Sequence, residues 1–172
     1  MGRGISGHEK PIEGATNVWL TPRDIIDGLG PFDLDPCAAD PRPFDIAATN
    51  YTVAQDGLSL PWHGFVWCNP PYGPWVGRWL DRMRDHANGI ALVFARTETQ
   101  AMQRALRTAE TAFFLARRVS FLKGVPPFEQ GTKTSGAPSV LLAYGDTAME
   151  RLKSFSMKRE GALYLNGCVR AA

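Results

Sequence analysis

The stretch Gly64-Phe65-Val66-Trp67-Cys68-Asn69-Pro70-Pro71-Tyr72 joins a short apolar run to an abrupt stop. Residues 64–68 are rich in β-forming side chains and bounded by turn residues, which predicts a buried strand. The two prolines then prevent the strand from continuing and fix a stiff turn. We therefore expect a strand whose carboxyl end presents the Asn69 and Tyr72 side chains at the edge of a sheet.

Strands and helices alternate on both sides of this turn. A helix is expected over residues 74–87, because Val76, Leu80 and Met83 fall on one face at helical spacing. The remaining patterns predict strands over residues 32–35, 90–95, 112–115 and 139–144, helices over 97–107 and 147–155, and a strand near Leu163. This alternation predicts a single-domain, Rossmann-like α/β fold with a mostly parallel sheet and helices on both faces. In such sheets ligands bind at the carboxyl ends of the strands.

Two helix starts carry capping signals. Thr21 and Asp24 fit a capping box with Pro22 in the first turn, and Thr97 and Gln100 fit a second box. Glycines end the first segment early, so a short helix or a single capped turn is expected there.

Composition narrows the classes of protein to consider. The chain has 172 residues, 44% hydrophobic, 21% charged and a net charge of +2, which fits one ordinary globular domain. No apolar run approaches the ~20 residues of a membrane span, and residues 1–14 lack the apolar core of a secretory signal. The three cysteines are scattered, so neither disulfides nor a metal site are expected. These features predict a cytoplasmic protein with a flexible arm over residues 1–16 and a folded domain over residues 17–172.

The Asn69-Pro70-Pro71-Tyr72 turn suits one particular chemistry. The amine of adenine N6 is a poor nucleophile, because its lone pair is delocalised into the ring. Two acceptors aimed at its hydrogens, the Asn69 side-chain oxygen and the Pro70 carbonyl, would localise that lone pair. Tyr72 offers a flat face on which a base removed from the duplex can stack. The alternative is that the tetrapeptide is merely a turn that ends a strand.

Four motifs in this order resemble the phage-type DNA N-6-adenine methyltransferases, a Dam-like family: Trp19-Leu20-Thr21-Pro22, Phe32-Asp33-Leu34-Asp35-Pro36-Cys37-Ala38, Asp56-Gly57-Leu58 and Asn69-Pro70-Pro71-Tyr72. The resemblance runs from about residue 18 to residue 144. It implies a methyltransferase domain that uses S-adenosyl-L-methionine and acts on adenine in DNA. It also implies a catalytic motif formed by Asn69, Pro70, Pro71 and Tyr72.

The resemblance further implies where the methyl donor would bind: Trp19, Thr21, Pro22, Asp35, Pro36, Ala38, Asp56 and Asn69. A glycine-rich turn normally follows the first strand in methyltransferases, but here Cys37 and Ala38 take its place. We therefore expect fewer backbone contacts to the donor. An acidic residue for the ribose hydroxyls is not obvious, and Asp45 is a candidate.

Basic residues after the later strands are candidates for contact with DNA. The expected set is Arg96, Arg117, Arg118, Phe121, Lys123 and Lys133, with Phe121 flanking the extruded base. Any one of them could instead belong to a solvated face or the core. The chain has no room for a separate recognition domain, so residues 123–138, the N-terminal arm or a homo-oligomer would share that task. Competing hypotheses are methylation of an RNA base or a protein glutamine, and a non-catalytic DNA-binding protein.

Overall fold

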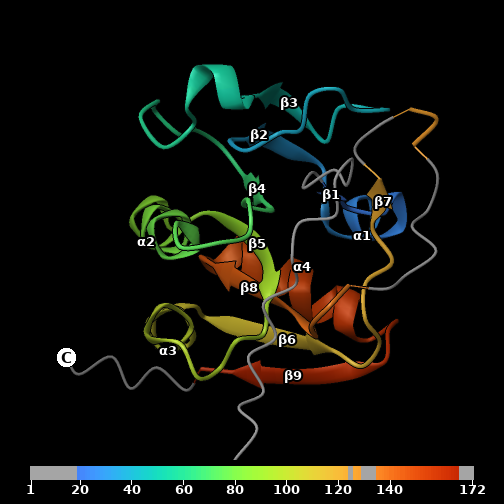
Figure 1. Ribbon diagram of the computed structural model, residues 1–172. Coiled ribbons are helices and arrows are strands. Elements are labelled where there is room, and N and C mark those ends of the chain that lie inside the picture. Colours follow the sequence, from blue (N-terminus) through green and yellow to red (C-terminus); the bar gives the residue numbers. More distant parts are fainter. Residues whose placement is uncertain (1–18, 124–125, 129–134, 167–172) are drawn as a thin grey trace, which may run out of the picture.

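The computed structural model describes residues 19–123, 126–128 and 135–166. Within these ranges the chain forms nine strands, four α-helices and one short 3-10 helix (Figure 1). In chain order they are β1 (Trp19–Leu20), α1 (Arg23–Leu29), β2 (Phe32–Asp35), β3 (Ala47–Asn50), η1 (Val53–Gln55), β4 (Val66–Cys68), α2 (Val76–His86), β5 (Gly89–Phe94), α3 (Gln100–Thr108), β6 (Thr111–Leu115), β7 (Leu122–Lys123), β8 (Ser139–Tyr144), α4 (Asp146–Ser156) and β9 (Gly161–Leu165).

Seven strands form one mixed sheet in the order β3-β2-β4-β5-β8-β6-β9. The pairings β3–β2, β2–β4 and β4–β5 are parallel, whereas the pairings β5–β8, β8–β6 and β6–β9 are antiparallel. The expected α/β class is confirmed, but the mostly parallel sheet is not. Only the half of the sheet from β3 to β5 is parallel.

The connections explain the mixed directions. The chain passes from β5 to β6 through α3, and both strands are antiparallel to β8, so they run in the same direction. Such a crossover through a helix is what a pair of parallel strands requires. The segment between β6 and β8 contains no helix among its described residues, and β8 runs back between β5 and β6.

Helices cover both faces of the sheet, as expected. On one face, Leu29 of α1 and Leu152 of α4 belong to the same buried cluster as Trp67. On the other face, Met83 of α2 and Met102 of α3 cluster with Cys68. Trp67 and Cys68 are consecutive in β4, so their side chains point to opposite faces. This central strand is therefore buried on both sides, directly before the Asn69 turn.

The two predicted capping boxes do not form as expected. α1 begins after Pro22 without a side-chain cap bond, and Thr21 instead contacts Asn69. α3 begins at Gln100, where the Thr99 side chain accepts a hydrogen bond from the Met102 amide at 3.3 Å. Thr99 therefore replaces Thr97 as the cap.

Part of the expected domain organisation lies outside the described residues. This holds for the proposed arm over residues 1–16 and for eight residues of the 123–138 loop, namely 124–125 and 129–134. No helix in the described part of the chain is long and apolar enough to span a membrane.

Candidate active site

The carboxyl ends of β2, β4 and β5 meet at one edge of the sheet, because these strands are successive parallel neighbours. β2 ends at Asp35, β4 ends at Cys68 directly before Asn69, and β5 ends at Phe94. β8 begins at the same edge, since Ser139 pairs with Phe94. Two motifs that are about 30 residues apart in the chain thus lie side by side where ligands bind in such sheets.

The Asn69 side chain is held in one orientation. Its Nδ2 donates to the Trp19 carbonyl oxygen at 3.2 Å and to Thr21 Oγ1 at 3.3 Å. Because a carbonyl oxygen can only accept, the NH2 half of the amide must face Trp19. The Oδ1 atom then points the other way, where it is buried and has no hydrogen-bond partner among the described residues. Buried acceptors usually have a partner, so Oδ1 is the half of the amide whose hydrogen-bonding capacity the described residues leave unused.

The segment before α1 supplies both partners of Asn69. β1 pairs antiparallel with β7, which joins Trp19 to Lys123 and Leu20 to Leu122. Thr21 is 1% exposed, so its hydroxyl reaches Asn69 away from solvent. Trp19 and Thr21, two of the residues expected to bind the donor, therefore position the Asn69 turn directly.

Three aromatic rings adjoin the turn. Tyr72 stacks on Phe94 with ring centroids 3.9 Å apart and planes 5° apart, and Phe121 meets Tyr72 edge-on at 6.4 Å. Burial raises the pKa of Tyr72 well above its usual range, and its hydroxyl has no partner among the described residues. Phe94 was not among the expected site residues. Its place at the end of a buried strand, two residues before Arg96, was the available signal.

Asp35 is a buried carboxyl at the same edge, with 3% of its surface exposed. Its Oδ1 accepts a hydrogen bond from the Cys37 amide at 3.0 Å. Burial raises the pKa of Asp35 to about 7, and the bond from Cys37 opposes that rise only in part. A carboxyl in this condition ionises readily when a cation binds beside it.

The backbone amides after Pro36 are already used within the protein. The Cys37 amide donates to Asp35, and the Ala38 amide donates to the Tyr51 carbonyl at 2.8 Å. A glycine-rich turn would offer such amides to a ligand. In this protein the amides of Cys37 and Ala38 have intramolecular acceptors instead.

Cys37 and Cys68 touch at the ends of β2 and β4, with their sulfur atoms 3.8 Å apart. Burial, followed by the neighbouring thiol, raises the pKa of Cys37 well above its ordinary value. The thiol therefore stays protonated, which is the opposite of an activated nucleophile.

The Asp56-Gly57 turn lies against Pro36. A Cβ at Gly57 would overlap the Pro36 carbonyl oxygen, so only glycine fits this approach. Trp62 Nε1 donates to the Gly57 carbonyl at 2.7 Å and fixes the turn. Asp56 is exposed and has a left-handed backbone with φ of 51°. The structure thus places the Asp56-Gly57 turn beside Pro36, the residue that follows Asp35.

Asp45 lies near the edge of the sheet at which β2 and β3 begin. It precedes β3, whose first residue Ala47 pairs with the first residue of β2, Phe32. Its carboxylate pairs with Arg42 Nε at 2.6 Å. Arg42 also donates to the Ala39 carbonyl at 3.2 Å, so Asp45 is linked through Arg42 to the loop that follows Asp35.

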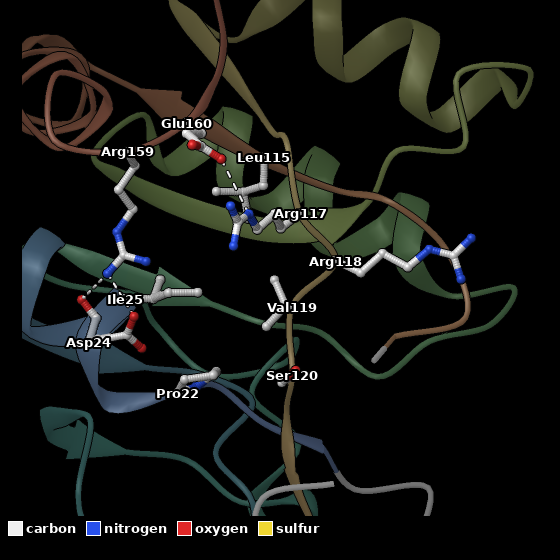
Figure 2. A pocket seen from close by; sticks show the side chains of 10 residues that line it. All are labelled: Pro22, Asp24, Ile25, Leu115, Arg117, Arg118, Val119, Ser120, Arg159 and Glu160. Carbon is white, nitrogen blue, oxygen red and sulfur yellow. Dashed lines mark hydrogen bonds and ion pairs between the residues drawn. The ribbon is translucent and has the colours of Figure 1, made fainter. Parts of the chain in front are cut away.

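A cavity of about 450 Å³ lies between the start of α1, the segment after β6 and the residues before β9 (Figure 2). Arg117 and Arg118 line it from the segment after β6, and Arg159 lines it from the opposite side. Arg159 pairs with Asp24 at 2.7 Å and Arg117 pairs with Glu160 at 3.2 Å.

Arg118 differs from its two neighbours. Its Nη1 donates to the Ser135 carbonyl at 3.3 Å, and it forms no ion pair among the described residues. The cavity also adjoins the Asn69 turn. Its lining residue Pro22 follows Thr21, which contacts Asn69, and its lining residue Ser120 precedes Phe121, which contacts Tyr72. An anion that approaches the turn from this side would therefore meet Arg118 without having to displace a carboxylate.

The other expected DNA contacts are distributed unevenly. Arg96 is exposed two residues after the end of β5, on the same edge as the turn. Phe121 is 3% exposed, so it belongs to the core as well as to the aromatic group around Tyr72. Lys123 is half-buried in β7, and Lys133 lies outside the described residues.

In the described part of the chain, no three His, Cys, Asp or Glu side chains are grouped so that they could hold a metal ion.

No curated protein and no solved structure matches the chain. A family model described as DNA N-6-adenine-methyltransferase (Dam) matches residues 10–169 of the 172. That match spans nearly the whole sequence and includes every element of the edge described above, so the chain belongs to the DNA N-6-adenine-methyltransferase (Dam) family.

Proposed function

We propose that this protein transfers a methyl group from S-adenosyl-L-methionine to N6 of adenine in DNA. The observation that carries the proposal is the buried Asn69 Oδ1, which has no partner among the described residues although the rest of the amide is fixed. Membership of the DNA N-6-adenine-methyltransferase family supports the substrate class. We expect a site-specific enzyme that acts in the cytoplasm of a bacterium or a phage-infected host.

The Asn69-Pro70-Pro71-Tyr72 turn would activate the amine of a flipped adenine. Asn69 Oδ1 and the Pro70 carbonyl would each accept one hydrogen of the N6 amino group. This draws the nitrogen toward a tetrahedral geometry and frees its lone pair. The amine would then attack the methyl carbon as the carbon–sulfur bond breaks, with S-adenosylhomocysteine as the leaving group, and the extra proton on the nitrogen would pass to water. Positioning of this kind supplies a large part of the lowering of a barrier.

The residues beside the turn fit a cationic donor. The sulfonium of S-adenosyl-L-methionine supplies a methyl group that is already electrophilic. Asp35 provides a buried carboxyl whose pKa of about 7 would fall when a positive charge binds beside it. Thr21 and Pro22 would enclose the methionine part, and the Asp56-Gly57 turn would face the adenosine. Trp19, Pro36 and Ala38 complete the proposed donor site.

The aromatic group would hold the flipped base. Tyr72 has one face on Phe94 and meets the edge of Phe121, so the ring is fixed before any base arrives. Stacking of a base on an aromatic side chain contributes about 1–3 kcal/mol. The base would stack on the part of the Tyr72 ring that Phe94 and Phe121 leave open, with its amino group toward Asn69.

The DNA backbone would cross the same edge of the sheet. Arg118, which lines the cavity, and Arg96, which follows β5, would contact phosphates near the turn. Arg117, Lys123 and Lys133 remain proposed contacts, together with the arm over residues 1–16 and the loop over residues 123–138.

The test is to incubate the protein with deuterated-methyl donor and with DNA, RNA or a glutamine-containing protein, followed by mass spectrometry of the products. We expect label on N6-methyladenine from DNA. Label only in RNA or in protein would support the rival substrates, and no label in any of them would support a non-catalytic binder.

Two variants sharpen this test. Asn69→Ala removes an acceptor from the reacting group and should lower the rate about 100-fold or more, by analogy with the loss of one donor that stabilises a transition state. Asn88→Ala is the matched control, since Asn88 precedes β5 at the opposite edge and donates to the Gly64 carbonyl. Methyl transfer at the wild-type rate by Asn69→Ala would refute the acceptor role.

A further inference from the structure

The outermost strand of the sheet, β9, has one edge that pairs with β6 and one edge without a partner among the described residues. Every residue of β9 is exposed, and the large side chains Leu163, Tyr164 and Leu165 are 37%, 61% and 53% exposed. An exposed apolar edge is a template for another strand, and β9 has no lysine, proline or other guard residue. We propose that β9 pairs antiparallel with β9 of a second copy of this chain.

Both ends of the strand are anchored to the fold. The Asn166 amide donates to the Glu110 carbonyl at 3.0 Å, and Asn166 Nδ2 donates to the carbonyls of Leu106 and Ala109 at 2.8 and 2.9 Å. At the other end, the Ala116 amide donates to the Glu160 carbonyl at 3.2 Å. Because β9 is already ordered, little binding free energy is lost in ordering this strand when a second strand pairs with it.

The free backbone groups of β9 are arranged symmetrically about Leu163. The hydrogen bonds at Glu160 and Asn166 show that even-numbered residues direct their N–H and C=O groups toward β6. Backbone direction alternates along an antiparallel strand, so Gly161, Leu163 and Leu165 direct theirs outward. An antiparallel pairing centred on Leu163 brings Gly161 opposite Leu165 of the second copy and Leu163 opposite itself. All the outward groups of both strands are then paired.

The same register matches large side chains with small ones. Leu165 faces Gly161 of the second copy, and Tyr164 faces Ala162. Residues directly opposite each other lie on the same face of a sheet and touch. Each bulky side chain therefore occupies the space that its small partner leaves, and the two Leu163 side chains meet at the axis. This self-complementarity identifies a second copy of the chain as the occupant of the edge.

The pairing has a consequence for the active sites. A two-fold axis normal to the sheet reverses every strand in the second copy, so the carboxyl ends of β2 and β4 in the two copies lie at opposite edges of the continuous sheet. The two sites face away from each other, and each would act alone. Weak complexes bury less than about 1,200 Å². A contact five residues long is in that class, so we expect dimers that dissociate on dilution.

Sedimentation velocity of the full chain over a concentration series tests the proposal. We expect a species of twice 18.9 kDa that dissociates on dilution. Leu163→Lys and Leu163→Glu each place like charges opposite one another, so each should be monomeric, whereas an equimolar mixture should dimerise. Val53→Lys, at a residue of η1 that is 94% exposed, is the matched control and should dimerise as the wild type does.

A monomer at every concentration would overturn the proposal, and so would dimers of both Leu163 variants or a mixture that stays monomeric. A variant truncated after Asn166 tests the other possible occupant of the edge, the C-terminal residues of the same chain. If this variant dimerises and the full chain does not, those residues cover the edge. The rate of methyl transfer per chain in Leu163→Lys should equal that of the wild type. A loss of rate with an unchanged circular dichroism spectrum would contradict the opposed arrangement of the sites.

Discussion

Replacing Asp35 with asparagine removes a buried ionisable group and leaves an acceptor for the Cys37 amide. Burial raises the pKa of the carboxyl from its ordinary 3.8 to about 7 in the folded protein. The Asp35 carboxyl therefore ionises at a lower pH in the unfolded chain than in the folded protein. Stability that is fully present below about pH 4 is lost as the pH rises to about 7. About three pKa units at roughly 1.4 kcal/mol each set an upper bound of roughly 4 kcal/mol on that loss.

The variant should not show this loss. Its free energy of unfolding, relative to that of the wild type, should increase between about pH 4 and pH 8 by a few kcal/mol at most. Urea titrations followed by tryptophan fluorescence at several pH values would measure it. Asp33→Asn is the matched control, because this carboxyl on the same strand is exposed and accepts a hydrogen bond from the Phe65 amide. Parallel stability curves for wild type and Asp35→Asn would refute the account of Asp35.

Donor binding should respond to pH in the opposite sense. A cationic donor binds best beside an ionised carboxylate, so its affinity should rise as the pH increases toward the pKa of about 7 and then level off. The expected gain is at most about tenfold per pH unit below that value. Calorimetry with S-adenosyl-L-methionine should show this rise for the wild type and weaker, flatter binding for Asp35→Asn. The same pH dependence in both proteins would place the donor away from Asp35.

Three further predictions concern residues around the turn. Tyr72→Phe should keep the fold and the rate, because the lost hydroxyl has no partner among the described residues. Tyr72→Ala should lose about 1–3 kcal/mol of stacking, measured as a fall in kcat/KM. Equal rates for both variants would exclude stacking. Gly57→Ala forces a Cβ into the Pro36 carbonyl and should lower unfolding free energy by about 1–3 kcal/mol, with an unchanged urea midpoint as the contrary result. Arg118→Ala should reduce the slope of log affinity for DNA against log salt by about one, and Arg117→Ala, whose partner is Glu160, should reduce it less; an unchanged slope for Arg118→Ala would remove it from the DNA surface.

Much of the fold was predictable because apolar runs between turn residues mark buried strands. The bounds expected for β2 and β8 agree with the structure. The direction of β8 was not predictable, since a run of apolar residues packs equally well in either direction. β3 escaped notice because Ala47–Asn50 is short and only one of its residues is buried. The direction of the segment that carries Asp45 was therefore not predictable either.

The candidate site was predictable where a motif has a single use, and less so where a residue has two. Thr21 fits a helix cap by its local sequence, yet the tertiary contact with Asn69 uses its hydroxyl instead. Phe94 resembles an ordinary core residue, and only the fold shows that it supports Tyr72. Local patterns do not encode such contacts, because they join residues from different elements.

The most direct measurement is a structure of the protein bound to adenine-containing DNA and a donor analogue that has no transferable methyl group. The account predicts that N6 of one flipped adenine lies about 2.7–3.2 Å from both Asn69 Oδ1 and the Pro70 carbonyl, with the base stacked on Tyr72. A bound base with its amino group away from Asn69, or with Tyr72 turned away from it, would contradict the central claim.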